Sequence, residues 1–225
     1  MIREGTGIEI ITGLYGVGTP EQNALVECIM GGARAAERFE VYFHWHNLIH
    51  ELGHGIMWFY TKERPHPVDA EVLVNRFAVA YWRHYGEAEK LEILRETVGH
   101  ALGQFARPVG EDVSAMDYAK EKWGQEELYN FNNYGWFQMS CVADVLREEL
   151  DLRAVLEQMG GANLVEPPRK LLCYELDEDT PGRTVADAVE MMREWGIVLP
   201  GVRVTFDDDP NRHMCAVEGI SGGTI

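Results

Sequence analysis

The chain has 225 residues, of which 46% are hydrophobic and 25% are charged. This composition is typical of a globular protein with a substantial core, and we expect one domain or one domain with an appendage. The formal net charge of −17 disfavours nucleic acid or an anionic membrane as the main partner, because both would repel the protein. The same charge is also consistent with a role in solubility alone.

The cysteines and the N-terminus indicate a compartment. Four cysteines stand far apart in the sequence and form no C-x-x-C pair: Cys28, Cys141, Cys173 and Cys215. Free thiols in a reducing environment are therefore expected. The first residues, MIREGTGIEIITG, lack the apolar run of a signal peptide, and no apolar run reaches the length of a membrane span. The sequence predicts a cytoplasmic protein with no membrane partner.

Helices are predicted to dominate the first two thirds of the chain. Residues 7–12, GIEIIT, are expected to form a strand, and a glycine-rich turn leads from it into a helix over residues 20–31. Gly13 and Gly18 have the spacing of a phosphate loop, but Thr19 stands where that loop needs a lysine. We therefore expect an ordinary turn. Further helices are predicted over residues 40–60, 68–84, 86–105, 113–123, 135–149 and 151–159.

A boundary is predicted where two breaker pairs, Gly160-Gly161 and Pro167-Pro168, follow the last of these helices. Beyond it the pattern predicts a strand over residues 170–176, a helix over 184–196 and a strand over 202–206. FDDDPNR, residues 206–212, is expected to be a solvated turn, since its acidic spacing does not fit an EF-hand. The fold class is thus α+β: a mostly helical core over residues 1–163 with a small N-terminal sheet, and a small α/β segment over 164–225 that could belong to the same domain.

The stretch HWHNLIHELGHGI, residues 44–56, contains an H-E-x-x-H motif. On a helix His50 and His54 lie one turn apart on one face, and an apolar stripe occupies the opposite face. Two imidazoles at this spacing can hold one zinc ion. Glu51 lies beside them and is the expected general base, close enough to reach a metal-bound water.

A catalytic zinc needs a third protein ligand, and the next predicted helix supplies a candidate. Glu71 and Asn75 lie one turn apart among mostly apolar neighbours. A carboxylate in such a helix is costly unless it is paired or binds a metal. We therefore predict Glu71 as the third ligand and Asn75 as a group that orients a histidine. The alternative is that Glu71 pairs with Arg76 or is an acid of the first helical turn.

These two motifs resemble those of the gluzincin class of zinc peptidases, to which thermolysin belongs. HELGH followed by E-x-x-V-N-R-F-A is also similar to the ImmA/IrrE-type metallopeptidases, although Val74 replaces the usual alanine of their second motif. The resemblance covers residues 43–82, about a fifth of the chain. It implies a zincin-like core, a peptide or protein substrate, Glu51 as the base, Asn75 in support of a histidine, and Zn²⁺ held by His50, His54 and Glu71.

The roles of several other polar residues are left open by the sequence. His46 could be a further ligand, a residue lining the cleft or a histidine satisfied near the helix start, while His44 is expected to be structural. His100, Tyr129 and Tyr134 are candidates for stabilising an oxyanion. The favoured alternatives are a core histidine for His100 and, for the aromatic and amide-rich stretch over residues 129–138, a packed loop before a helix.

The sequence therefore predicts a zinc-dependent peptidase that hydrolyses peptide bonds through a metal-bound water activated by Glu51. The alternative is a non-catalytic or vestigial zincin-fold protein with a binding or regulatory role. A third interpretation is a purely structural histidine helix without metal.

Overall fold

The structure is a computed structural model that describes residues 2–3, 7–86 and 88–207. Its α-helices are α1 (Pro20–Met30), α2 (Ala35–Phe39), α3 (Asn47–Tyr60), α4 (Pro67–Tyr85), α5 (Ala88–Leu102), α6 (Ala115–Lys122), α7 (Phe131–Val145), α8 (Leu152–Gln158) and α9 (Thr180–Glu194). Two short helices, the 3₁₀-helix η1 (Gly32–Arg34) and the π-helix η2 (Glu40–His46), lie on either side of α2. The strands are β1 (Ile2–Arg3), β2 (Gly7–Gly13) and β3 (Val202–Asp207). The fold is α+β and mostly helical, as predicted.

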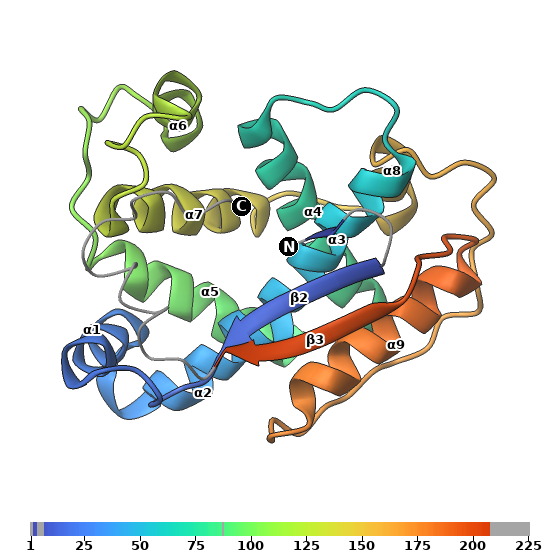
Figure 1. Cartoon of the computed structure of the whole chain (residues 1–225), viewed down its shortest axis with the longest axis horizontal. Coiled ribbons are helices and arrows are strands. Elements are labelled where there is room, and N and C mark those ends of the chain that lie inside the picture. The colour runs from blue at the N-terminus through green and yellow to red at the C-terminus, as the bar shows by residue number, and fades with distance from the viewer. Residues whose placement is uncertain (1, 4–6, 87, 208–225) are drawn as a thin grey trace.

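A three-stranded sheet joins the two ends of the described chain (Figure 1). Its order is β1-β2-β3, with β1 antiparallel and β3 parallel to β2. Ile8 and Ile10 of β2 alternate with more exposed residues and are at most 2% exposed, so one face of the strand packs on the helices. Strands β2 and β3 were predicted, but β1 and the parallel pairing of β2 with β3 across nearly the whole chain were not.

Helices α3 and α4 form the pair on which the candidate site is built. Most of the apolar stripe predicted for α3 is buried: Leu48, Ile49, Leu52 and Ile56 are each 0% exposed, whereas Phe59 near the end of the helix is 46% exposed. Gly53 faces α4 so closely that an added Cβ would lie 3.0 Å from Phe77 and 3.1 Å from Val74. The absence of a side chain at this position therefore allows the two helices to approach closely.

The predicted helix over residues 40–60 is not uniformly α-helical, because η2 interrupts it before α3 begins. A π-helix uses i→i+5 hydrogen bonds and so changes the angular phase of the side chains along the helix. Trp45 of η2 is 0% exposed and stacks on Trp82 of α4, with ring centroids 4.2 Å apart. His44 joins η2 to the end of β2, since its two ring nitrogens lie 2.5 Å from a Glu40 carboxylate oxygen and 2.7 Å from the Gly13 carbonyl oxygen. This agrees with the structural role expected for His44.

The C-terminal part of the described chain packs on the same hydrophobic core as the N-terminal part. Met192, Trp195 and Ile197 are each at most 1% exposed and belong to the cluster that also contains α3 and α4. The division of the chain at residue 163 stays a prediction.

Several sequence-based assignments of secondary structure are wrong; helix α9, for example, begins at Thr180 rather than at residue 184. Residues 170–176 form no strand; this segment lies along the end of α4, where the Leu172 amide donates to the Tyr85 carbonyl oxygen at 2.9 Å. Helix α7 begins at Phe131 rather than at residue 135, because the Asn130 side chain caps it by accepting from the Asn133 amide at 3.0 Å. The aromatic stretch at 129–138 is therefore largely helix.

Other expectations about local structure can be compared directly. The turn before α1 is an ordinary helix start: Thr19 and Gln22 form a reciprocal capping box. Cys28, Cys141 and Cys173 are free thiols, while Cys215 and most of the predicted acidic turn at 206–212 lie outside the described residues. Among the helices of the described ranges, none combines the length and apolar character that a membrane span requires.

Candidate metal centre

Helix α3 places the two motif histidines side by side. His50 and His54 are one turn apart, and their rings meet edge to face with centroids 4.9 Å apart. The His50 residue is only 5% exposed, whereas the His54 side chain is 25% exposed. The pair is therefore buried on one side and open to solvent on the other.

Glu71 of α4 faces both histidines from across the helix pair. One carboxylate oxygen, Oε2, lies 3.4 Å from His50 Nε2, and the other, Oε1, lies 3.4 Å from His54 Nε2. One ligand atom from each of the three residues can be chosen so that all lie within 4.8 Å of one another, and this group could hold a metal ion. The predicted trio is thus brought together, and the Glu71 residue is only 4% exposed.

The spacing of these atoms fits a metal ion better than direct hydrogen bonding. Zinc ligands lie about 2.0–2.2 Å from the ion, so two ligands at a tetrahedral angle are roughly 3.3–3.6 Å apart. The two nitrogen–oxygen distances of 3.4 Å lie in that range. A charged N–H···O hydrogen bond is normally shorter, at about 2.7–2.9 Å. The three side chains are therefore spaced so that they could hold a metal ion.

The electrostatics of the metal-free site reflect the pairing of opposite charges. Burial alone would lower the pKa of His50, but the Glu71 carboxylate outweighs burial and raises that pKa to about 9. Burial alone would likewise raise the pKa of Glu71, and the two histidines instead hold it well below its usual range. Without metal, His50 is therefore an imidazolium paired with a carboxylate, and a metal ion must displace its proton.

Asn75 occupies the position behind His50 that the sequence predicted. Its Oδ1 accepts from His50 Nδ1 at 3.0 Å, and its Nδ2 donates to the Glu71 carbonyl oxygen at 3.0 Å and to Cys141 Sγ at 3.4 Å. Because Nδ1 of His50 is committed as a donor, Nε2 is left to face Glu71 and a metal. Asn75 is 1% exposed, which makes its orientation well determined by these partners.

His46 shares the same asparagine instead of joining the three ligand candidates. Its Nε2 donates to Asn75 Oδ1 at 3.3 Å, and the residue is 1% exposed. Burial and the nearby His50 lower its pKa to about 3, so the ring stays neutral. Of the interpretations left open for His46, the structure favours a buried polar residue that supports the site.

Glu51 follows His50 on α3 and is only partly buried. It lies close enough to the centre for its charge to contribute to the raised pKa values of His50 and Tyr134. Glu51 is therefore placed beside the histidines, where a base would be needed.

Of the three residues considered for oxyanion stabilisation, Tyr134 lies at this centre. Burial, followed by the charges of Glu71 and Glu51, raises the pKa of Tyr134 well above its usual range, so its hydroxyl keeps its proton. Tyr129 is engaged elsewhere, because its hydroxyl oxygen accepts from the Gly124 amide at 3.3 Å.

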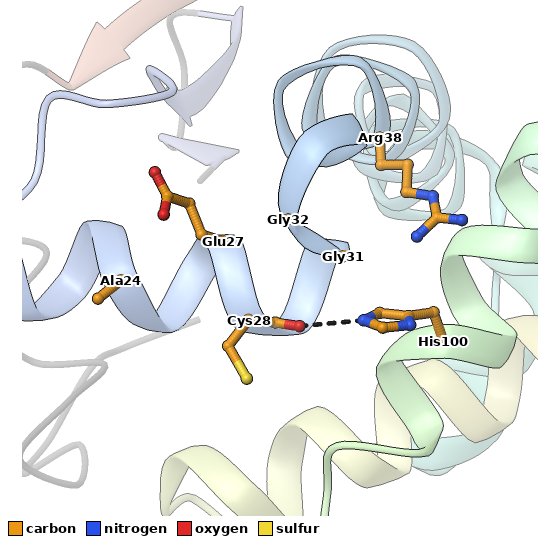
Figure 2. A pocket seen from close by; sticks show the side chains of 7 residues that line it. All are labelled: Ala24, Glu27, Cys28, Gly31, Gly32, Arg38 and His100. Carbon is orange, nitrogen blue, oxygen red and sulfur yellow. Dashed lines mark hydrogen bonds between the residues drawn. The ribbon is translucent and has the colours of Figure 1, made fainter.

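His100 lies in a different part of the molecule, on α5 (Figure 2). Its Nε2 donates to the Cys28 carbonyl oxygen at 3.0 Å, and Arg38 donates to the Met30 carbonyl oxygen at 3.1 Å. Both therefore cap the C-terminal end of α1, within an open depression of about 480 Å³. His100 is structural, and it takes no part in the metal centre.

Gln138 contacts Glu71 at this centre, and the sequence analysis did not identify it. Its Nε2 donates to Glu71 Oε2 at 3.1 Å and to the Tyr134 hydroxyl oxygen at 2.9 Å. Tyr134, Gln138 and Cys141 are spaced i, i+4, i+7 along α7 and so share one face of it. Gln138 and Cys141 fall in the helix predicted over residues 135–149, but Tyr134 precedes that helix, so the face that the three residues share was not recognised.

Comparisons with protein-family models, curated proteins and solved structures find no match to this chain. The likeness to gluzincins thus rests on the two motifs, and the case for a metal centre rests on the geometry of His50, His54 and Glu71.

Proposed function

We propose that this protein is a zinc-dependent peptidase whose ion is held by His50, His54 and Glu71. The observation that carries the proposal is the 3.4 Å spacing between each histidine Nε2 and a Glu71 oxygen, combined with Glu51 beside the pair. Two imidazoles and one carboxylate form a ligand set found in catalytic zinc sites, where a fourth position stays open. The partial exposure of His54 supports such an open side.

Each residue of the site has a separate role in the proposed hydrolysis. A bound zinc ion supplies Lewis-acid chemistry, polarising a carbonyl group and lowering the pKa of a water molecule. Glu51 accepts the proton of the attacking water on its carboxylate and passes it to the leaving amine. Tyr134, with its proton retained, donates a hydrogen bond to the oxygen on which charge develops. Asn75 holds His50 in the tautomer that leaves Nε2 free.

A purely binding protein would not need Glu51, and this favours hydrolysis over the non-catalytic alternative. The net charge of −17 disfavours nucleic acid as a substrate. The resemblance to gluzincin motifs supports a peptide or protein substrate, and we place the activity in the cytoplasm on the grounds of the sequence.

The test combines zinc analysis with cleavage of a broad peptide library, with and without a chelator. We expect one zinc per chain and chelator-sensitive cleavage, and we expect Glu51→Gln to keep the zinc and lose cleavage. Glu63→Gln is the matched control, because it makes the same change at an exposed residue just after α3. Stoichiometric zinc without any cleavage would favour the non-catalytic alternative, and absence of zinc binding would refute the proposal.

A further inference from the structure

We infer that Gln138 of α7 is a positioning residue of the metal centre, which links the Glu71 carboxylate to the Tyr134 hydroxyl. The inference rests on the proposed function, because it assigns Gln138 a role in that same site. The new element is the role of helix α7, which carries none of the ligand candidates. Through Gln138 it would position both the ligand Glu71 and the oxyanion donor Tyr134.

The starting observation is that one amide nitrogen serves two partners. Gln138 Nε2 donates to Glu71 Oε2 at 3.1 Å and to the Tyr134 hydroxyl oxygen at 2.9 Å. A side-chain amide carries two N–H donors on its nitrogen, so both hydrogens are used. Helix α7 contacts α4, and the link between Gln138 and Glu71 joins these helices at the metal centre.

The chemistry of Glu71 decides which way the amide of Gln138 points. A carboxylate is acceptor-only, and the two oxygens of Glu71 lie 3.4 Å from the Nε2 atoms of His50 and His54. The amide must therefore turn its nitrogen, not its oxygen, toward Glu71. This interaction restrains rotation of a carboxylate whose other oxygen faces His54, and a restrained ligand loses less freedom when a metal binds.

The amide in turn determines how the phenol of Tyr134 is used. Since Gln138 donates to it, the Tyr134 oxygen is the acceptor in this contact, and its own proton remains available for a different acceptor. Gln138 thereby keeps the Tyr134 O–H free to donate to a substrate at the centre, instead of to Gln138 itself.

The competing explanation is that Gln138 only ties α7 to α4. A purely structural hydrogen bond between these helices would add to the stability of the fold, but it would not change the affinity of the folded protein for zinc. The two explanations therefore differ in a measurable quantity, the zinc dissociation constant of the folded protein.

The test replaces Gln138 by methionine, which has a similar length and volume and no N–H donor. Gln158→Met is the matched control, since it makes the same change at an exposed residue of α8. Zinc alone is the probe, and its dissociation constant is measured by competition with a chromophoric chelator. Thermal unfolding of the metal-free proteins reports stability separately. Loss of a group that orients a ligand typically weakens metal binding about 10- to 100-fold, and we expect that change for Gln138→Met and none for Gln158→Met.

A second variant and a kinetic measurement separate positioning from folding. Gln138→Asn keeps the amide but is one carbon shorter, so it cannot reach both partners, and a similar loss of zinc affinity is expected if Gln138→Met does not fold. With zinc saturating and a cleaved library peptide as substrate, Gln138→Met should lower kcat more than it raises KM. Adding it to Tyr134→Phe should lower kcat no further, because the two residues act as a unit.

The possible outcomes test the role of Gln138 separately from the proposed zinc-peptidase function. Folded Gln138 variants that bind zinc as tightly as the wild type would overturn the inference while leaving the proposed function intact. Failure of the wild type to bind zinc would overturn the proposed function, and the inference with it.

Discussion

Gly53 provides a prediction that tests the helix packing and the site together. An alanine Cβ at this position would lie 3.0 Å from Phe77 Cδ1 and 3.1 Å from both Cβ and Cγ1 of Val74. Carbon atoms pack best at about 3.5–4.0 Å, so α3 and α4 would have to separate by roughly half an ångström. The matched position is Gly99 on the exposed side of α5, where an added Cβ meets nothing within 4 Å.

The two substitutions gain the same intrinsic helix propensity and differ in packing. Gly→Ala within a helix is favourable by about 0.5–1 kcal/mol, and Gly99→Ala should stabilise the protein by that amount. Overpacking a core costs about 1–3 kcal/mol, so Gly53→Ala should be less stable than Gly99→Ala by about 1–3 kcal/mol. Since α3 carries His50 and α4 carries Glu71, opened packing should also weaken zinc binding.

The assay is urea unfolding of both variants in the presence of a chelator, followed by zinc titration of the folded proteins. If Gly53→Ala stabilises the protein as much as Gly99→Ala and binds zinc equally well, the close approach of α3 and α4 does not have the role argued here.

The remaining predictions concern the groups around the metal. For the chelated protein, the pKa of His50 is raised to about 9 from an ordinary 6.5, so its stabilising contribution is complete below about pH 6.5. That contribution is lost as the pH rises through about 9. Urea unfolding across this range should show the loss, and Glu71→Gln should remove most of it. Apparent zinc affinity should change in the opposite sense, strengthening as the pH rises toward 9, because the ion displaces the proton of His50. Asn75→Leu leaves the buried His50 N–H without an acceptor; we expect a loss of about 1–3 kcal/mol in unfolding free energy and about 10- to 100-fold in zinc affinity. An Asn75→Leu protein with wild-type zinc affinity would contradict the role given to this side chain.

The residues of the candidate centre could be predicted because their geometry is local to two helices. His50 and His54 lie one turn apart on any α-helix, and the burial of Glu71 follows from its apolar neighbours. The same reasoning placed Asn75 one turn from Glu71.

The contacts that were missed depend on tertiary structure or on an interrupted periodicity. The parallel pairing of β2 with β3 joins Ile8 to Val202, and no local pattern specifies a partner so distant in the chain. The π-helix η2 breaks the 3.6-residue period before α3, so a regular wheel describes His46 poorly. Gln138 was missed because the predicted helix began at residue 135 and left out Tyr134, whereas the Asn130 cap starts α7 at Phe131 and brings both residues onto one helical face.

Diffraction from crystals grown with zinc, measured on both sides of the zinc absorption edge, locates the ion directly. We expect one anomalous peak that lies within about 2.0–2.2 Å of His50 Nε2, His54 Nε2 and a carboxylate oxygen of Glu71. A map with no peak among these three residues, from crystals soaked at a saturating zinc concentration, would contradict this expectation.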